Sequence, residues 1–360
     1  MTAFDKPLIA LTMGDPSSVS SEVIVKYFFD SQPYNEVGII VVGDLCCIAD
    51  AIDRAKLPLH VNCIQTPAEI SQQANTVNLY DLSILCPGSW EYKKPSALNG
   101  KAAFSYLEVA NSFALNGEID AIVTMPISKQ SLKMARYPYA GNTDILVELS
   151  GNPEHSNMLI NDFLRVMSVT NHLPFKDVLT HITEERVFKT ITHANSALIM
   201  CGENNPKIAV CGINPHAAPN CILEREDEEI VLPAINRAKA LGLDVSGPMD
   251  VSAAFSSAYT GQFDGIISMY HDQTNPAFIL ASVATNCSAN PLFSLTSGVN
   301  MTYGLPYIRT SVDYDERFDI AGDGKAEPCG LNAAVKCALK LIHGKKTRTQ
   351  IEAKGQASAD

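Results

Sequence analysis

The sequence predicts an α/β fold in which short strands and helices alternate and build a mostly parallel sheet covered on both faces. Short, continuously apolar runs recur along the chain, as is typical of strands buried on both sides. Segments with apolar residues three or four positions apart separate these runs, which indicates helical connections between parallel strands. The chain has 360 residues, enough for two domains of about 150 residues each.

The first half of the chain contains six such segments. Apolar runs predict strands, apolar periodicity predicts helices, and turn residues such as Gly43 and Asp44 separate them. In chain order we expect a strand at Leu8–Thr12, a helix at Ser21–Phe29, a strand at Gly38–Val42, a helix at Cys46–Ala55, a helix at Lys101–Leu115 and a strand at Asp120–Thr124.

The second half continues the alternation. We expect a strand at Lys207–Cys211, a helix at Glu228–Leu241, strands at Asp264–Met269 and Tyr307–Val312, and a helix at Leu331–Ile342. The helix at 228–241 has acidic residues at its start and Lys239 near its end, which suits the helix dipole. The stretch Leu280–Thr296 lacks periodicity and predicts a long loop, and the polar segment Lys345–Asp360 predicts a frayed tail.

Composition excludes several classes of protein. The 27 basic and 39 acidic residues give a net charge of −12, which disfavours binding to nucleic acid or an anionic membrane. A hydrophobic fraction of 46% with 18% charged residues argues against disorder. The sequence contains no apolar run of about 18 residues, and Lys6 is the only basic residue before the first apolar run, so we expect a cytoplasmic protein. The ten cysteines show no CxxC pattern, which favours reduced core thiols.

Three histidines follow predicted strands or apolar runs. His172 follows the apolar run 166–169, and His216 and His271 follow the strands at 207–211 and 264–269. Because ligands bind at the carboxyl edge of open α/β sheets, three imidazoles there could form an open metal site. A single histidine after a strand is more often a hydrogen-bonded structural residue, so both interpretations stand on this evidence alone. No GxGxxG fingerprint and no P-loop occurs in the sequence.

Longer motifs carry a resemblance to a known family. ALTMGDP near the N-terminus, NHLP, GINPHA, MYHDQ, GVNMTYGLPYIRTSVD and DIAG occur in this order. This combination resembles the 4-hydroxythreonine-4-phosphate dehydrogenase family of vitamin B6 synthesis. The resemblance implies two α/β/α lobes with a cleft between them, as in isocitrate and isopropylmalate dehydrogenases. It also implies a homodimer with a shared active site. We expect residues 1–130 and 303–346 in one lobe, 131–302 in the other, and a polar tail at 347–360.

The resemblance assigns roles to individual residues. Its metal ligands, three histidines contributed by both subunits, fall on His172, His216 and His271. Its substrate-binding residues fall on Asn142, Thr143, Asn300 and Arg309, of which Arg309 suits bidentate recognition of a phosphate. Asp272, beside a proposed ligand, could orient an imidazole or relay a proton, or could serve only as a turn or helix-cap residue.

The chemistry implied is the oxidation of a phosphorylated β-hydroxy acid, 4-phosphohydroxythreonine or a related four-carbon acid, followed by decarboxylation. The cofactors implied are NAD or NADP and a divalent metal, which could be Zn²⁺, Mg²⁺, Mn²⁺ or Co²⁺. The partner is then a small anionic molecule.

Four departures from the family pattern qualify this reading. Serines replace two glycines and a proline in the loop Gly14–Glu22, so that loop must be rebuilt if the glycines held positive φ. Ile279 stands where the family has a substrate lysine, and Asn142 stands where it has a histidine. The segment Tyr314–Arg317 replaces a His-Gly loop that helps to hold NAD, and it introduces two carboxylates.

These departures leave two alternatives. One is a dehydrogenase of an unphosphorylated hydroxy acid or of a cis-dihydrodiol carboxylate, which Ile279 favours and Arg309 opposes. The other is a metal-binding family member that has lost hydride transfer, such as a lyase or a regulatory small-molecule binder, which the altered segment Tyr314–Arg317 favours.

Overall fold

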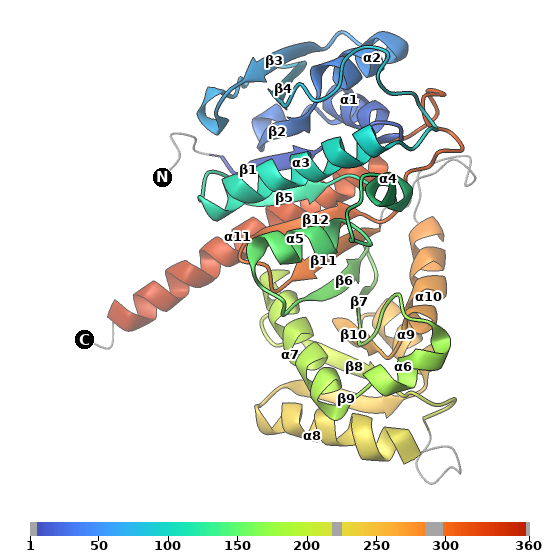
Figure 1. Cartoon of the computed structure of the whole chain (residues 1–360). Coiled ribbons are helices and arrows are strands. Elements are labelled where there is room, and N and C mark those ends of the chain that lie inside the picture. The colour runs from blue at the N-terminus through green and yellow to red at the C-terminus, as the bar shows by residue number, and fades with distance from the viewer. Residues whose placement is uncertain (1–5, 218–224, 285–297, 358–360) are drawn as a thin grey trace. The chain divides into compact units, whose positions relative to one another are not determined.

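The computed structural model describes the backbone of residues 6–217, 225–284 and 298–357, and it confirms the mixed α/β class (Figure 1). The chain divides into two compact units. The first contains residues 1–155 and 286–342, and the second contains residues 156–285 and 343–360.

The described strands of the first unit lie in the order β3-β4-β2-β1-β5-β12-β11. They are parallel except for β11, which is antiparallel to β12. The strands are β1 Leu8–Thr12, β2 Gly38–Gly43, β3 His60–Ile64, β4 Thr76–Asp81, β5 Ala121–Thr124, β11 Val299–Tyr303 and β12 Ile308–Val312. The helices are α1 Ser20–Ser31, α2 Leu45–Ala55, α3 Ala97–Leu115, α4 Lys129–Met134, α5 Asn142–Ser150 and, as far as Ile342, α11 Cys329–Ala357.

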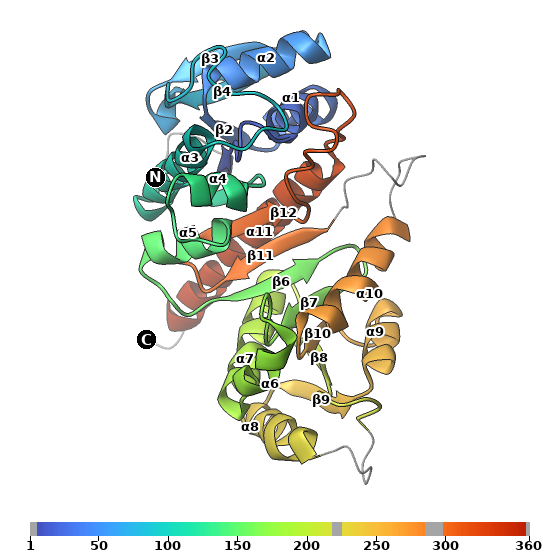
Figure 2. The same ribbon diagram turned by 45° about the vertical axis from the view of Figure 1, so that its right-hand side comes forward.

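Burial explains why these segments form a sheet. Every residue of β1, β2, β5 and β12 is buried, as continuous apolar runs require when helices cover both faces. Figure 2 shows α3 on one side of these strands and α1 and α2 on the other. Up to Ile342, α11 buries Leu331, Ala334, Val335, Ala338 and Leu341, a spacing of three and four residues that marks one helical face.

The second unit has the strand order β6-β7-β10-β8-β9 among its described residues. All neighbours are parallel except β6 and β7. The elements are β6 Ser156–Ile160, β7 Arg165–Ser168, α6 Phe175–His181, α7 Glu184–Met200, β8 Lys207–Cys211, α8 Leu232–Ala240, β9 Asp244–Met249, α9 Val251–Tyr259, β10 Gly265–Ser268 and α10 His271–Ala284. Figure 2 shows α7 and α8 on one side of these strands and α9 and α10 on the other.

Three segments differ from their sequence predictions. The expected helix 228–241 begins with a π-helical turn at Asp227–Val231 before α8, because Pro233 has no N–H to donate to the preceding turn. The expected loop 280–296 is helical up to Ala284 as part of α10, and residues 285–296 lie outside the described range. The expected frayed tail continues α11 to Ala357, since Lys, Arg, Gln, Glu and Ala readily extend an established helix.

The boundary between the units also differs from the expected one. The sequence places residues 131–155 in the second lobe, whereas the structure places them in the first unit. Helices α4 and α5 pack against α3, so this segment shares the core of the first unit. The segment 299–302 likewise belongs to the first unit, because β11 pairs with β12.

The serine-rich loop after β1 needs no glycine at the substituted positions. Ser18 and Ser20 are absent from the described residues with positive φ, whereas Gly14 has φ +74°. The hydroxyl of Ser18 donates to the Asp15 carbonyl at 2.6 Å and accepts from the Ser20 N–H at 3.1 Å. The serines therefore satisfy the loop's own polar groups.

The sequence predicts reduced thiols in the core, and it contains no apolar run long enough to span a membrane. Of the eight cysteines within the described ranges, Cys47, Cys201 and Cys211 are buried, whereas Cys63 and Cys86 are exposed. The expected burial in the core therefore holds for only some of the described cysteines. Among the described helices, none combines the length and apolarity of a membrane span.

The Gly14→Ala variant tests the loop geometry. A Cβ at Gly14 would lie 2.3 Å from the Pro126 carbonyl oxygen, and the left-handed backbone adds a penalty of about 1–2 kcal/mol. We expect the free energy of unfolding in urea to fall by more than about 3 kcal/mol. The matched control is Gly117→Ala, because Gly117 also has positive φ but a Cβ there meets nothing within 4 Å. It should cost only about 1 kcal/mol, and equal losses in the two variants would contradict the clash.

Candidate substrate and metal site

Arg309 is the most unusual charged residue of the first unit. It lies on β12 and only 3% of it is exposed. Its Nη1 donates to the hydroxyls of Thr302 at 2.9 Å and Thr143 at 3.2 Å, and its Nη2 donates to the hydroxyl of Thr124 at 2.7 Å. Neutral oxygens therefore surround the guanidinium.

The sheet positions this group. In the register of the antiparallel pair β11–β12, Arg309 lies opposite Thr302. Asn300 is two residues from Thr302 and so points to the same face. Thr124 is the last residue of β5, and Thr143 lies in the first turn of α5. The structure therefore places Thr143 in contact with Arg309, and Asn142 precedes Thr143 in the chain.

Several polar atoms around Arg309 lack a partner within the described part of the chain. They are Arg309 Nε and the buried amide oxygens of Asn142 and Asn300. The Asn142 amide nitrogen donates to the Met125 carbonyl at 3.0 Å. The set thus offers an unused N–H and two unused carbonyl oxygens.

The electrostatics of the site follow from burial. Desolvation lowers the pKa of Arg309 well below its ordinary value, to about 10, so the guanidinium is charged at neutral pH. No carboxylate among the described residues forms an ion pair with it. A buried charge without a counter-ion is costly, and an anionic ligand would remove that cost.

The three predicted metal ligands all belong to the second unit. His172 follows β7, His216 follows β8 and His271 begins α10 directly after β10. The rings of His172 and His271 lie 5.4 Å apart, measured between centroids. The structure therefore brings these two imidazoles together at the carboxyl ends of neighbouring parallel strands.

His216 is placed differently. It has φ +72°, in the left-handed region, and its side chain is 80% exposed. Its Nδ1 lies 3.6 Å from Asp250 Oδ2. Within the residues that the structure covers, no three side chains of metal-ligand type form a cluster.

Asp272 lies beside His271 in the first turn of α10. Its Oδ2 is 3.6 Å from His271 Nδ1, and its side chain is 78% exposed. The amide of Asn275 lies 2.8 Å from His271 Nε2. Both neighbours are placed to orient the ring.

Two positioning residues were not predicted from the sequence. Gln273 accepts from the Met269 N–H at 2.8 Å and donates to the Gly212 carbonyl at 2.9 Å, which ties the loop before His271 to the loop before His216. Asp227 accepts from the N–H groups of Ile213 and Asn214, and burial raises its pKa. The only signal in the sequence was the position of Gln273 within the MYHDQ motif.

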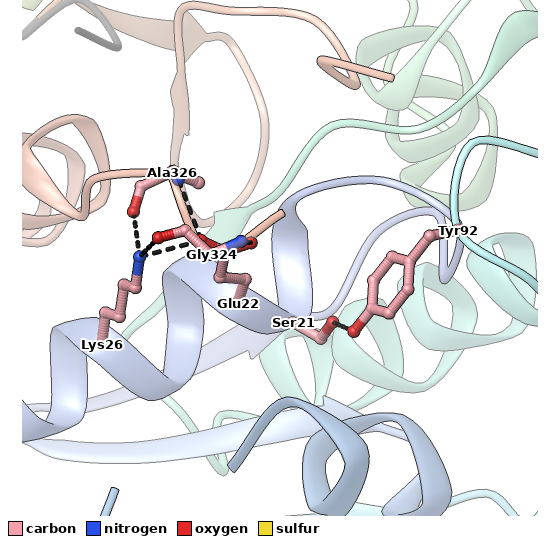
Figure 3. Close-up of polar contacts among 6 residues, drawn as sticks. All are labelled: Ser21, Glu22, Lys26, Tyr92, Gly324 and Ala326. Atoms are coloured by element: carbon pink, nitrogen blue, oxygen red, sulfur yellow. Dashed lines mark hydrogen bonds and ion pairs between the residues drawn. The ribbon is translucent and has the colours of Figure 1, made fainter. Parts of the chain in front are cut away.

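The segment that follows the replaced NAD loop, Gly324–Ala326, is hydrogen-bonded to α1 within the first unit. Figure 3 shows Glu22 and Lys26, on successive turns of α1, reaching Gly324 and Ala326. The Glu22 carboxylate accepts from both backbone N–H groups, and Lys26 Nζ donates to both carbonyls. Arg317, with φ +47°, pairs with Asp319 at 2.9 Å. Ile279, at the family's lysine position, is 44% exposed on α10.

A protein-family model matches most of this chain. The family model described as "Pyridoxal phosphate biosynthetic protein PdxA" matches residues 35–338. The chain belongs to this family.

Relatives in the PdxA family match almost the whole chain. The D-threonate 4-phosphate dehydrogenase of Cupriavidus necator is 37% identical over 93% of this chain and 97% of its own. The 4-hydroxythreonine-4-phosphate dehydrogenase of Trichlorobacter lovleyi is 35% identical over 93% and 98%. A solved 4-hydroxythreonine-4-phosphate dehydrogenase from Klebsiella pneumoniae superposes with a TM-score of 0.82 at 30% identity, covering 94% of this chain and 99% of that one. The predicted family and α/β class are confirmed.

The Gln273→Leu variant tests the bridge between the histidine loops of this PdxA-family chain. It leaves the Met269 N–H and the Gly212 carbonyl without partners, so both loops should loosen. We expect Mn²⁺ affinity, measured by calorimetry, to fall by about 10- to 100-fold. Gln262→Leu, at an exposed position, is the control and should leave the affinity unchanged. An unchanged affinity in Gln273→Leu would show that the bridge does not position the ligands.

The Arg309→Met variant tests anion recognition. Removing one partner of a buried charge pair costs about 2–5 kcal/mol, so the affinity for a phosphorylated hydroxy acid should fall by at least about 30-fold.

For the native protein, affinity should hold from neutral pH to about pH 9 and decline as pH rises through about 10, because only the protonated guanidinium attracts the anion. Calorimetric titrations across this range measure both effects. An affinity in Arg309→Met equal to that of the native protein would contradict the assignment.

Proposed function

We propose that the protein is a metal- and NAD(P)-dependent dehydrogenase of a small phosphorylated hydroxy acid. The substrates we propose are 4-phosphohydroxythreonine, D-threonate 4-phosphate or a related four-carbon acid, with decarboxylation after oxidation. The observation that carries this proposal is Arg309, a buried guanidinium that donates to three threonine hydroxyls and whose Nε has no partner among the described residues. The names of the relatives, which act on phosphorylated hydroxy acids, agree with it.

Within this proposal, Arg309 binds an anionic group of the substrate. Its Nε supplies a donor that has no other partner in the described chain. The Thr124, Thr143 and Thr302 hydroxyls fix the orientation of the guanidinium, so little conformational freedom is lost on binding. The oxygens of Asn142 and Asn300 can accept from substrate hydroxyl groups.

The residues around His172 and His271 fit a divalent metal. Two imidazoles lie close together, and hydrogen bonds from the side chains of Thr170 and Gln273 to backbone groups of Met269 hold the adjoining loops. When bound, the metal would polarise the substrate hydroxyl and the nicotinamide would accept the hydride. Asp272 is placed to orient His271 or to relay a proton at its Nδ1.

We propose a homodimer in which a second chain completes the metal ligand set. The exposed His216, apart from the His172–His271 pair, supports this arrangement, since an exposed imidazole is available to another chain. We also propose a cytoplasmic location and no nucleic-acid partner, in line with the net charge of −12.

One observation favours a second candidate function. Ile279 puts an apolar, partly exposed side chain where the family has a cationic lysine. This favours an unphosphorylated hydroxy acid or a cis-dihydrodiol carboxylate, with Arg309 binding a carboxylate instead of a phosphate.

A spectrophotometric activity assay distinguishes the two candidate functions. Purified protein with Mn²⁺, Zn²⁺, Mg²⁺ or Co²⁺ is given NAD or NADP and a panel of phosphorylated and plain hydroxy acids, and the absorbance of reduced nicotinamide is followed. We expect turnover with D-threonate 4-phosphate or 4-phosphohydroxythreonine. Turnover with only the plain acids would favour the second candidate. No turnover with any acid, together with no calorimetric binding of NAD or NADP, would contradict both.

The His271→Ala variant tests the metal assignment. We expect loss of bound metal, measured by mass spectrometry of the desalted protein, and loss of activity. His60→Ala, on the exposed first residue of β3 in the other unit, is the control and should keep both. Metal content at the native level in His271→Ala would refute the role of this histidine.

A further inference from the structure

The helix α10 carries a second polar side chain on the same face as His271. Asn275 lies four residues after His271, and one helical turn brings side chains at this spacing together. The amide nitrogen of Asn275 is 2.8 Å from His271 Nε2. The same spacing places two metal ligands on one face of a helix in the H-E-x-x-H motif. Asn275 is therefore within reach of an ion bound at Nε2.

The contacts of the His271 ring identify Nε2 as the nitrogen that can bind a metal. An amide NH₂ group only donates hydrogen bonds, so Nε2 accepts from Asn275 and the ring hydrogen lies on Nδ1. The Asp272 carboxylate is 3.6 Å from Nδ1. A carboxylate beside one ring nitrogen and a metal at the other is a recurrent arrangement of histidine ligands. A metal at Nε2 would replace the amide N–H, and rotation of the amide would present the oxygen of Asn275 to the ion.

The turn that carries these two side chains is fixed to the sheet of the second unit. Thr274, which precedes Asn275, forms hydrogen bonds with the hydroxyls of Ser168, at 2.8 Å, and Ser268. These serines are the last residues of β7 and β10, and their hydroxyls are 3.0 Å apart. All three hydroxyl-bearing residues are buried. The backbone that presents His271 and Asn275 is therefore held in place, which lowers the cost of ordering a ligand set.

We propose that the amide oxygen of Asn275 is a ligand of the metal bound at His172 and His271, whose rings are 5.4 Å apart. This inference rests on the metal site of the proposed function and adds a donor to it. Imidazole nitrogens suit Zn²⁺, whereas amide oxygens are hard ligands that suit Mn²⁺ and Mg²⁺. The oxygen of Asn275 thus raises the affinity of this site for Mn²⁺ more than for Zn²⁺.

The Asn275→Leu variant tests the ligand, because leucine has a similar size but no donor atom. We expect the affinity of the full-length protein for Mn²⁺, measured by calorimetry, to fall at least about tenfold. The affinity for Zn²⁺ should fall less, since Zn²⁺ depends less on an amide oxygen. The control is Asn204→Leu, at an exposed position of the second unit, which should bind both ions like the native protein.

The Asn275→Asp variant separates a metal ligand from a residue that only orients the ring. A carboxylate keeps an oxygen donor but loses the N–H that Asn275 donates to Nε2. If the oxygen binds the metal, this variant should bind Mn²⁺ at least as tightly as the native protein. Weaker binding in both Asn275→Asp and Asn275→Leu would show that only the donated hydrogen bond matters, and would overturn the proposal. Tighter binding in Asn275→Leu would also overturn it, because Asn275 would then only cover Nε2.

The same titrations separate this proposal from the proposed function. Native protein that binds neither Mn²⁺ nor Zn²⁺ would overturn the metal site and with it the role of Asn275. Binding of Zn²⁺ without Mn²⁺, or an unchanged affinity for Mn²⁺ in Asn275→Leu, would overturn only the role of Asn275. Because metal binding is measured without turnover, an absence of dehydrogenase activity leaves the result standing.

Discussion

The first unit buries the positive charge of Arg309 with no carboxylate paired to it among the described residues, and the arrangement around Arg309 depends on that. Burial lowers the pKa of this guanidinium well below its ordinary value, to about 10, because desolvation disfavours its charged form. The three threonine hydroxyls come from β5, α5 and β11. These two strands and this helix must therefore be correctly aligned for the hydroxyls to accept from the guanidinium N–H groups of Arg309. An anion at Nε would offset the cost. The buried charge therefore supports the proposed role of Arg309 in binding an anionic ligand.

The second unit positions its histidines by a different means. Short loops after the neighbouring parallel strands β8 and β10 carry His216 and His271, and buried polar side chains fix these loops through backbone groups. Gln273 joins two loops with one side chain, and Asp227 accepts from two successive N–H groups. Such contacts set the direction of an imidazole more tightly than packing alone. Anion recognition and the proposed metal ligands are thus distributed over different units of the chain.

The sequence predicted the buried strands best, because a continuous apolar run has few other structures available to it. The bounds of Lys207–Cys211 and Leu8–Thr12 agree with the structure. The half-exposed β3, with its polar His60 and Asn62, and the short β11, which contains Asn300 and Thr302, have no such run and were not predicted. The π-turn before α8 depends on a single proline, and the extension of α11 depends on a helix already formed upstream. Periodicity detects neither effect.

For the candidate site, motifs located the residues but not their environment. Arg309, Thr143 and Asn142 were expected from the resemblance, whereas the full burial of Arg309 and its shell of hydroxyls depend on strand register. Gln273 and Asp227 act on backbone groups of distant loops, which no local pattern encodes. The serines of the Gly14–Glu22 loop show the converse, since side-chain hydrogen bonds accommodate substitutions that the sequence marks as disruptive.

The most direct test of the account is a crystal structure of the protein with Mn²⁺ and D-threonate 4-phosphate. The account predicts a phosphate or carboxylate oxygen within hydrogen-bond distance of Arg309 Nε, and an anomalous peak for the metal at His172 and His271. A substrate bound elsewhere, with Arg309 Nε still without a ligand, would contradict it.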